Sequence, residues 1–481
     1  RRLDYRQAGR LLELVATGRS GLKSALYKAA TGSPSTAGAN NSRRRMLCAL
    51  VCRALRSLNQ LESALINAGV LDAATGRPVV ADGSLPASRF ECLVQACDLL
   101  LRPATSSHRP PGVHPHLAER LRGVRLDSDT TDSSQAQPHQ LPRYARINRL
   151  LAQPAEVRAR LSADGFVAID DAEGGDVDSL RPGTYLAADA HIPDLLTFPA
   201  ADSARLAVHP LVTGGALCLV DKASCLPPVC LQPPPGAWVL DTCAAPGNKT
   251  LQLAAMVGPA GRVLAVDRDA QRFCELRRRL VAMGAGDRVR CLRCDCLQLG
   301  DWLSQRCRDR ITHILVDPSC SGSGLTARSV ERQALDGGAG AGASDAESAA
   351  AKEQQRLASL ANFQAMVLRS ALTDYPSARR VVYSTCSVHS EENEAVVQEL
   401  ANSFADKGWR LARLMKSSWP TRGLSAFDCG PMCLRAGPGT DRTCGFFVAC
   451  FKRDTGGSGA AARTAAFGMR KSSGRRRNRK R

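Results

Sequence analysis

The stretch VLDTCAAPGNKTLQLA, residues 239–254, decides the fold. An apolar run ends at Asp241, and a turn of small residues leads to Lys249, where a helical stretch opens. A loop that binds nucleoside triphosphates needs two glycines flanking four residues, with the second directly before the lysine, so that bare backbone N–H groups can wrap the phosphates. Cys243 and Asn248 stand at those two positions. We therefore expect this loop to hold a ligand with less charge.

Strand and helix patterns alternate around this stretch. Apolar runs of strand type, with amphipathic helical stretches among them, occur at residues 237–242, 261–267, 288–292, 311–317, 379–385 and 444–451. Apolar strands without polar alternation, separated by helices, indicate an α/β fold with a mostly parallel, doubly wound sheet. Such sheets bind ligands beyond the carboxyl ends of their strands, so we expect the functional residues there.

Composition divides the rest of the chain. We expect an N-terminal helical region at 1–101, a Pro- and Ser-rich linker at 102–141, a region leading into the core at 142–230, the core at 231–453 and a basic disordered tail at 454–481. Within the core, residues 333–355 are poor in large apolar groups and are expected to form a flexible insertion.

Charge and cysteine content narrow the class of protein. The formal net charge is +20, and the stretch from Arg470 to Arg481 has many arginines and no acid, which suits a polyanion or a nuclear import receptor. The 19 cysteines lack the regular spacing of a disulfide framework, which favours a reducing compartment. No zinc-finger spacing occurs, so we expect no metal site. No apolar run approaches the ~20 residues that cross a bilayer, so we expect no membrane partner.

Residues near the opening stretch suggest a ligand with a ribose. Asp267 ends the second strand of the core, where an acid can accept hydrogen bonds from two ribose hydroxyls; the alternative is that it only caps the next turn. The helix start after the loop favours a carboxylate. A ribose, a carboxylate and a small sulfonium match S-adenosyl-L-methionine better than a dinucleotide, whose G-x-G-x-x-G fingerprint is missing. Arg272 can pair with Asp267 or the ligand, and Asp295 can receive the adenine amine. The loop residues are Cys243, Ala244, Ala245, Pro246, Gly247, Asn248 and Lys249.

Two cysteines stand just past strand ends. VDPSCSGSG (316–324) places Cys320 shortly after Asp317, and YSTCSVHSEENE (383–394) places Cys386 after the next strand. Cysteines in a reducing cell are usually buried small hydrophobes. Here the turn residues around them, and a potential helix start after each, whose dipole favours a thiolate, indicate reactive thiols at one cleft.

A methyl donor beside a thiol suggests methylation of a pyrimidine carbon. Cytosine C5 is a poor nucleophile until a thiolate adds to C6, which turns C5 into an enamine carbon that can attack a sulfonium methyl group. Asp317 is the candidate to hold N3 and the exocyclic amine of the base. A base must then remove the C5 proton before the thiol can leave, and a second thiol can assist that release.

The motifs DTCAAPGNKT, AVDRDAQR, VDPSCSGSG and YSTCSVHSEENE resemble, in order and spacing, those of the Nop/Sun-domain RNA cytosine-5 methyltransferases. PRYARIN (142–148) and DKASCLPP (221–228) resemble segments that precede the family's core. The resemblance spans about residues 142–453 and implies a Rossmann-like class I methyltransferase core. It also implies that the methyl donor is S-adenosyl-L-methionine and that residues 142–230 position the RNA.

This resemblance assigns catalytic roles. Cys386 matches the nucleophile that forms a covalent adduct with cytosine C6, and Cys320 matches the thiol that assists product release. The family's donor contacts fall on the loop Cys243–Lys249, Asp267, Arg272 or Asp295, and Asp317. Many members read D-A-P-C-S where this chain reads D-P-S-C-S, but the interval from aspartate to thiol is unchanged, so only the local loop geometry is in doubt.

The RNA substrate must present a cytosine that is flipped out or taken from a loop. Arg143, Tyr144, Arg146 and Asn148 are the candidate RNA-binding residues, because they combine phosphate contacts with one stacking face; the alternative is that they begin a strand with a solvated face. Aromatic residues make up only 4% of the chain, so we expect electrostatic contacts, weakened by salt, to dominate binding.

Four further stretches, HIPDLLTFPA, WPTRGLS, CLRA and GFFVA, resemble the family member that methylates large-subunit ribosomal RNA. This implies rRNA methylation to 5-methylcytosine, pre-ribosomal particles as partners, and a monomer acting in ribosome biogenesis in the nucleolus of the nucleus. One rival is a DNA cytosine-5 methyltransferase, which the two-thiol layout disfavours. A second is an RNA-binding ribosome assembly factor whose catalysis is secondary, and a triphosphatase is a third.

Overall fold

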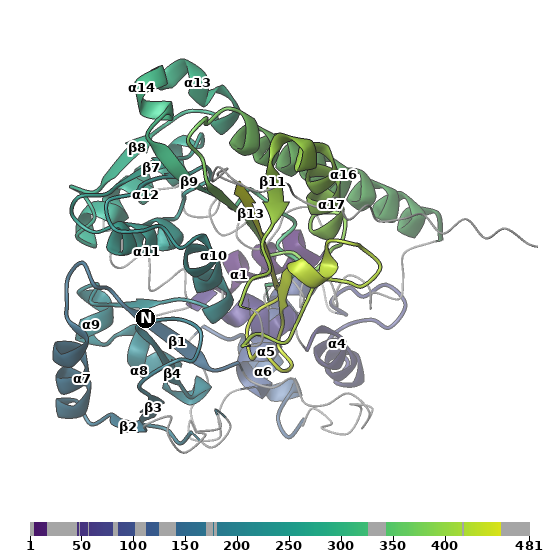
Figure 1. The fold of residues 1–481 in the computed structure, drawn as a ribbon. Coiled ribbons are helices and arrows are strands. Elements are labelled where there is room, and N and C mark those ends of the chain that lie inside the picture. The colour runs from purple at the N-terminus through teal and green to yellow at the C-terminus, as the bar shows by residue number, and fades with distance from the viewer. Residues whose placement is uncertain are drawn as a thin grey trace, which may run out of the picture.

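The computed structural model describes residues 4–16, 46–47, 49–55, 57–79, 85–101, 112–124, 141–169, 177, 180–325, 343–415 and 418–453. Figure 1 shows two sheets, with the larger one above the smaller, and a group of N-terminal helices beside them. The basic tail expected at 454–481 lies outside the described residues. Among the described helices, none combines the length and the apolar character needed to cross a membrane.

The larger sheet has strands β6 (Trp238–Asp241), β7 (Arg262–Val266), β8 (Val289–Leu292), β9 (Ile311–Val316), β10 (Arg380–Thr385), β11 (Trp409–Leu411), β12 (Leu434–Ala436) and β13 (Phe446–Arg453). Their order is β11-β13-β10-β9-β6-β7-β8, and β12 also pairs with β13. The strands from β8 to β10 pair in parallel, whereas β13 is antiparallel to β10, β11 and β12. This confirms the predicted α/β class with a mostly parallel sheet.

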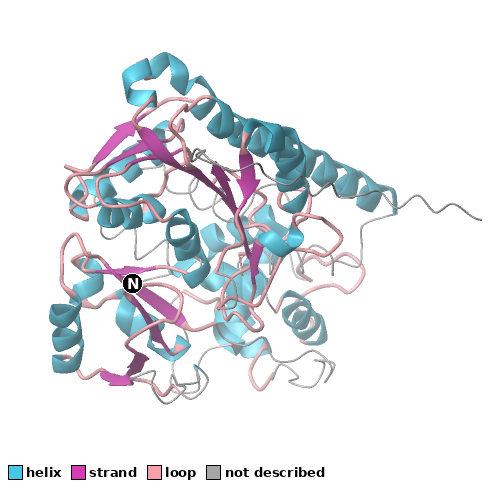
Figure 2. Ribbon diagram, in the orientation of Figure 1, coloured by secondary structure: helices cyan, strands magenta, loops and turns pink. Residues whose placement is uncertain are grey.

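Helices cover both faces of this sheet (Figure 2). They are α10 (Lys222–Leu231), α11 (Asn248–Val257), α12 (Ala270–Ala282), α13 (Leu299–Trp302), α14 (Gln305–Arg308), α16 (Ala343–Thr373) and α17 (Glu394–Phe404), with 3-10 turns η4 (Cys296–Gln298), η5 (Ala405–Lys407) and η6 (Gly430–Met432). Successive strand residues face opposite layers: Val382 packs in the cluster with α10 and α11, and Val381 in the cluster with α16 and α17. Burial on both faces explains why these strands lack polar alternation.

The smaller sheet has the order β2-β3-β4-β1-β5 and precedes the core in the chain. Its strands are β1 (Arg143–Ile147), β2 (Val167–Ile169), β3 (Thr184–Leu186), β4 (Leu195–Phe198) and β5 (Leu217–Leu219). Its helices are α7 (Pro154–Ala163), α8 (Ser203–Ala207) and α9 (Pro210–Thr213), with the 3-10 turn η3 (Ala200–Asp202). Strand β1 lies between β4 and β5, so its residues have neighbours on both sides.

The N-terminal region contains α1 (Tyr5–Ala16), α4 (Leu58–Asn67) and α5 (Arg89–Leu100), which pack in a common apolar cluster. This cluster also includes residues from the segment predicted to be a linker. Helix α6 (Pro115–Arg120) buries Leu117 against it, with Val113 and Leu121 on either side. Residues 112–124 are therefore not an extended linker, because three apolar side chains at four-residue steps bury one helical face.

The second half of residues 333–355, the segment predicted to be a flexible insertion, is helical in the structure. Helix α16 begins at Ala343 and continues to Thr373. Residues 343–355 are rich in Ala, Glu, Lys and Gln, which have high helix propensity, and they extend a helix that is anchored further along by buried Val367 and Leu368. The prediction rested on the lack of large apolar residues and did not take this helix propensity into account. Residues 326–342 lie outside the described residues.

Candidate active site

The loop between β6 and α11 forms one wall of the site. Gly247 has a φ of +98°, and a Cβ atom there would lie 2.9 Å from Cδ1 of Leu276, so glycine is required. The Gly247 N–H donates to the carbonyl of Ala244 at 2.7 Å, and the Ala244 N–H donates to the carbonyl of Val266 at 2.8 Å. These bonds hold the loop against the carboxyl end of β7.

Asp267 and Arg272 lie together beside this loop. The buried Asp267 carboxylate accepts the Ala245 N–H at 3.3 Å and lies 3.4 Å from Nη2 of Arg272. Arg272 also donates to the carbonyl of Ala245 at 2.8 Å. The remaining oxygen of Asp267 accepts the N–H of Asp269 at 3.1 Å. A carboxylate has about four acceptor positions, so Asp267 can still accept hydrogen bonds from ligand hydroxyls.

Asp295 follows β8 at the same edge of the sheet. Its Oδ1 accepts the N–H of Leu297 at 3.0 Å and so caps η4, and its Oδ2 lies 3.3 Å from Nη1 of Arg268. The Asp267 N–H donates to the carbonyl of Leu292 at the end of β8, which places Asp295 three residues from that contact. Asp295 therefore caps η4 and lies near Asp267 at the carboxyl edge of the sheet.

Two side chains of the loop differ in what they offer a ligand. Oδ1 of Asn248 is buried and has no hydrogen-bond partner among the described residues. Buried polar atoms are rarely left unpaired, so this oxygen is suited to accept from a ligand ammonium or hydroxyl group. The Cys243 thiol is hydrogen-bonded to the Cys296 thiol, and this hydrogen bond, with burial, raises the pKa of Cys243 well above the ordinary thiol value. Cys243 is therefore a neutral thiol that packs against the α16 side of the core.

Lys249 and Asp317 form an ion pair at the centre of the edge. Nζ of Lys249 lies 2.6 Å from Oδ2 of Asp317, and Oγ of Ser384 donates to Oδ1 of Asp317, also at 2.6 Å. Burial lowers the pKa of Lys249, but the charge and hydrogen bond of Asp317 and the charge of Cys386 outweigh it, so the pKa is raised. The ammonium also lies 5.3 Å from the centre of the Phe446 ring. Lys249 is thus held as a cation between a carboxylate and a thiol.

The sulfur atoms of Cys320 and Cys386 lie 3.0 Å apart. The hydrogen bond to Cys386, together with burial, raises the pKa of Cys320 well above the ordinary thiol value. This shift favours Cys320 as the thiol of the pair that keeps its proton. The helix predicted to start after Cys386 is α17, which begins at Glu394, eight positions further along the chain. The positive charge that acts on Cys386 is that of Lys249.

The backbone on either side of the thiols is fixed by a close contact between two glycines. The Gly324 N–H donates to the carbonyl of Cys386 at 3.0 Å, and the Gly445 N–H donates to the carbonyl of Gly324 at 2.8 Å. A Cβ atom at Gly324 would lie 2.1 Å from the Gly445 carbonyl oxygen. A side chain at Gly324 would therefore push the loop that carries Cys320 away from the segment that leads into β13.

Glu392 ties the loop after Cys320 to α16. Its carboxyl group is fully buried and accepts the N–H of Ser321 at 2.8 Å and Nε2 of Gln364 at 2.9 Å. Gln364 in turn donates to the carbonyl of Ser319 at 3.0 Å. Both sides of Cys320 are thus hydrogen-bonded to the same buried pair. No sequence pattern indicates a role for Glu392 or Gln364, although Glu392 belongs to the YSTCSVHSEENE motif.

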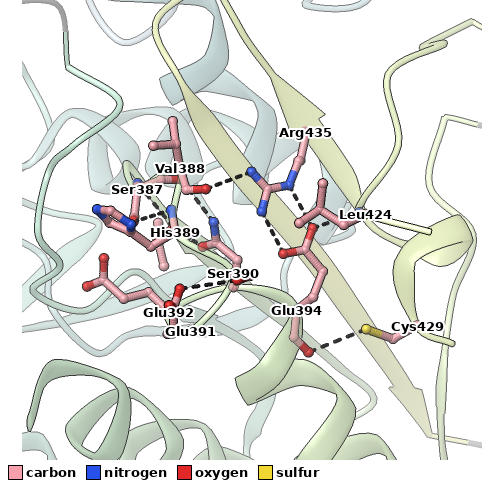
Figure 3. A network of polar contacts seen from close by, with 12 residues as sticks. Ser387, Val388, His389, Ser390, Glu391, Glu392, Glu394, Leu424, Cys429 and Arg435 are labelled. Atoms are coloured by element: carbon pink, nitrogen blue, oxygen red, sulfur yellow. Dashed lines mark hydrogen bonds and ion pairs between the residues drawn. The ribbon is translucent and has the colours of Figure 1, made fainter. Parts of the chain in front are cut away.

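Glu394 and Arg435 form a second buried anchor, shown in Figure 3. Nε and Nη2 of Arg435 each lie 2.7 Å from one oxygen of the fully buried Glu394 carboxylate. Arg435 also donates to the carbonyl of Val388 at 3.0 Å, and Glu394 accepts the N–H of Leu424 at 3.0 Å (Figure 3). The pair therefore fixes the segment that follows Cys386. The CLRA stretch contains Arg435, but no local pattern indicates its partner.

The residues proposed to contact RNA lie on β1 or, for Asn148, directly after it, and three of them are buried. Asn148 is 1% exposed and donates to the carbonyls of Gly215 and Met283 at 3.0 Å each. Tyr144 is 3% exposed, and its hydroxyl donates to the carbonyl of Arg442 at 3.0 Å. Neither can stack on a base or reach a phosphate from this position, because β1 lies inside the contact between the small sheet and the core.

The two arginines of this set differ from each other. Arg146 is 4% exposed, and its Nη2 donates to the carbonyl of Asn248 at 3.3 Å, in the loop beside α11. Its burial corrects the expectation of a surface phosphate contact. Arg143 is half-buried, and burial lowers its pKa, although the charge of Asp221 partly opposes this effect. Only Arg143 keeps partial access to solvent.

Two family models match the chain. Residues 228–452 match the family described as 16S rRNA methyltransferase RsmB/F. Residues 141–220 match the ferredoxin-like domain of NOL1/NOP2/Sun domain family member 5. The two matched ranges correspond to the large sheet with its helices and to the small sheet.

Characterised relatives and one solved structure are similar over most of the chain. The 28S rRNA (cytosine-C(5))-methyltransferase of Mus musculus is 39% identical over 342 residues, which are 69% of this chain and 67% of that protein. The 26S rRNA (cytosine-C(5))-methyltransferase nsun-5 of Caenorhabditis elegans is 35% identical over 348 residues, 69% of this chain and 72% of that protein. The crystal structure of PH0851 superposes with a TM-score of 0.59 at 17% identity, covering 94% of this chain and 99% of that one, which supports the fold. The chain therefore belongs to the NOL1/NOP2/Sun-domain family of RNA cytosine-5 methyltransferases.

Proposed function

We propose that this chain methylates C5 of a cytosine in large-subunit ribosomal RNA and takes the methyl group from S-adenosyl-L-methionine. The observation that supports this reaction most directly is the 3.0 Å separation of the Cys320 and Cys386 sulfurs beside the Lys249–Asp317 ion pair. The choice of RNA follows from the relatives, which are named for 28S and 26S rRNA.

S-adenosyl-L-methionine supplies an electrophilic methyl group when it is bound. The residues that suit it lie along one edge: Asp267 for the ribose hydroxyls, Asn248 for a donor group of the amino acid part, and Asp295 for the adenine amine. Arg272 holds Asp267 and the loop carbonyl of Ala245 in place. The buried, unpaired Oδ1 of Asn248 is the feature that fits a ligand best.

Cys386 begins the reaction as a thiolate next to the Lys249 ammonium. A bond forms between its sulfur and C6 of the cytosine, and the electron pair of the C5–C6 double bond becomes available at C5. Asp317, held by Lys249 and Ser384, accepts a hydrogen bond from the base and fixes its orientation. C5 then takes the methyl group. Because the fixed groups are charged and partly shielded from water, they act more strongly here than they would in solution.

Cys320 completes the cycle because its pKa depends on Cys386. The hydrogen bond to Cys386 is the main cause that raises the pKa of Cys320, and this cause disappears when the Cys386 sulfur is bonded to C6. Cys320 can then release its proton to solvent and accept the C5 proton of the methylated base. The C5–C6 double bond forms again, the bond between sulfur and C6 breaks, and Cys386 leaves as a thiolate.

The proposed setting is a pre-ribosomal particle in the nucleolus, where large-subunit RNA is modified, with the protein acting as a monomer. Bisulfite sequencing of large-subunit rRNA from cells with and without the protein tests the substrate. One cytosine should lose its methylation in the deletion and regain it with the wild-type chain, but not with Cys386→Ala. If Cys386→Ala restores growth and ribosome assembly in full while methylation stays lost, the protein acts chiefly as an assembly factor.

A further inference from the structure

A cationic pocket lies at the edge of the large sheet opposite the thiols. It has a volume of about 600 Å³ and lies where β10, β13, the loop after β11 and the end of α10 meet. We call it the distal pocket and define it by Arg380, Arg413 and Lys452, with Leu414, Met415 and His191 on its other walls. Its volume is within the range of ligand pockets, about 300–1,000 Å³.

The cations of the distal pocket have no acidic partner within the described part of the chain. None of the described residues that line the pocket is an Asp or a Glu, and Nε of Arg380 is buried without a hydrogen-bond partner. At the catalytic edge, by contrast, Lys249 is paired with Asp317. Three cations that face one hollow with no acid among its described lining residues, one of them with a buried and unpaired Nε, suit a bound anion, because the anion would offset their mutual repulsion and could accept from that Nε.

The strand register brings these cations together. Arg380 at the start of β10 stands directly opposite Lys452 in β13, and Arg410 in β11 stands opposite Lys452 on its other side. Directly opposed residues of neighbouring strands share a face, and like charges in such pairs destabilise a sheet. The C-terminal end of α10 adds only a partial negative charge at this place. A bound anion would relieve the repulsion that remains.

The distal pocket is separate from the catalytic edge. Arg380 is the first residue of β10, and Cys386 follows its last residue, Thr385. At ~3.3 Å per residue the two lie about 20 Å apart along the strand. An anion in this pocket cannot therefore be the methyl donor or the target cytosine.

We propose that the distal pocket binds a phosphodiester group, with its adjoining nucleoside, of the substrate RNA. Arginine presents a planar fork that fits phosphate oxygens, and Arg413 and Lys452 are exposed, so a polymer can reach them. Leu414 and Met415 offer an apolar wall to the sugar and base. The proposal rests on the proposed function, because it assumes that RNA is the substrate, and it adds a second RNA contact about 20 Å from the reacting base.

The test compares two double variants of the full chain that change the charge equally. Arg413→Glu with Lys452→Glu alters the pocket, and Arg290→Glu with Arg306→Glu alters two exposed arginines elsewhere on the core. RNA affinity is measured by fluorescence anisotropy with a large-subunit rRNA fragment over a series of salt concentrations. Methyl transfer is measured with labelled donor, and thermal melting shows that both variants fold.

The pocket variant should bind RNA at least tenfold more weakly, and the slope of log affinity against log salt should fall by about one to two, since each phosphate contact contributes about 0.9. Its KM for RNA should rise while kcat and donor affinity stay the same, and the control should change little. Equal weakening of both variants, or no weakening of the pocket variant, overturns the proposal. So does micromolar binding of adenosine monophosphate that depends on Arg413 and Lys452 while RNA affinity does not. If wild-type protein shows pocket-dependent RNA binding but no methyl transfer, the proposed function fails and the pocket stands.

Discussion

The sulfur atoms of Cys320 and Cys386 lie 3.0 Å apart, although 66 positions separate the two residues in the chain. They meet because β9 and β10 are parallel neighbours, so the residues that follow both strands reach the same edge. At this distance the two thiols are hydrogen-bonded, and this bond together with burial raises the pKa of Cys320 well above the ordinary thiol value. In the proposed mechanism, Cys386 attacks the base while Cys320 keeps its proton until the attack is complete.

Removal of either thiol should give a different defect. Cys386→Ala should reduce methyl transfer to background, because no bond to C6 can form. Cys320→Ala should keep the first steps and trap the methylated RNA on the protein, because no group takes the C5 proton. A denaturing gel with labelled RNA should show a stable adduct for Cys320→Ala and none for the double variant. A Cys320→Ala enzyme that turns over at the wild-type rate would contradict the release role.

Replacement of Asp267 should weaken binding of the methyl donor. Asp267→Asn keeps the size of the side chain but removes the charge that pairs with Arg272 and strengthens bonds to ribose hydroxyls. Hydrogen bonds to charged groups contribute about 1.5–3 kcal/mol, so the donor should bind about 10–100-fold more weakly. Isothermal titration with S-adenosyl-L-homocysteine measures this, and Asp301→Asn on the exposed face of α13 is the control. Equal affinity for both variants would remove Asp267 from the donor site.

Asp241 should make stability depend on pH. Burial raises the pKa of this carboxyl to about 7, despite the hydrogen bond that Thr250 donates to it at 2.7 Å. Between the ordinary value of 3.8 and about 7, the folded state keeps a proton that the unfolded state has lost. The free energy of unfolding should therefore fall as pH rises through this window.

Comparison with Asp241→Asn isolates this effect. Urea unfolding of both proteins between pH 5 and 8 should show the stability of the wild type falling relative to the variant, by up to about 3 kcal/mol at 1.36 kcal/mol per pKa unit. A difference between the two proteins that stays constant over this range would mean that Asp241 titrates normally in the folded state.

The Glu394–Arg435 pair should matter far more than an exposed pair. Arg435→Met leaves the fully buried Glu394 carboxylate without its partner and should cost about 3–5 kcal/mol of unfolding free energy. Arg369 and Glu399, which are about half exposed, form the control pair at 2.9 Å, and Arg369→Met should cost less than about 1 kcal/mol. Chemical denaturation measures both. Similar losses for the two variants would mean that the buried pair is no special anchor.

The strand ends were predictable from sequence because the apolar runs that form β6, β7, β9 and β10 are continuous. In a parallel sheet the carboxyl ends of all such runs lie at the same edge. The positions of Asp267, Asp317, Cys320 and Cys386 after these runs therefore predicted that they lie together at that edge. Pairing across the sheet could not be identified in this way. Glu394 and Arg435 are 41 positions apart, and each looks like an ordinary charged residue until the fold brings them together.

The RNA-binding residues show where local pattern misleads. Arg146 and Asn148 are polar residues of a type usually exposed, and their neighbours gave no sign of a covering surface. The structure buries them because β1 and the residue after it lie against the loop beside α11 and against the end of α12, in contacts that span 102 and 135 positions of the chain. Composition cannot reveal which face of a strand will be covered by another domain.

Strand β13 contributes to both ends of the core: Phe446 lies beside the Lys249 ammonium, and Lys452 lines the distal pocket. It is also the last of the described strands to leave the ribosome during synthesis. A nascent chain consequently has neither a finished catalytic edge nor a finished pocket until residues 446–453 emerge, however early its donor loop folds. A stop codon anywhere before that point should therefore abolish methyl-transfer activity. Truncations of different lengths within the core should all be inactive, with no gradual decline in activity.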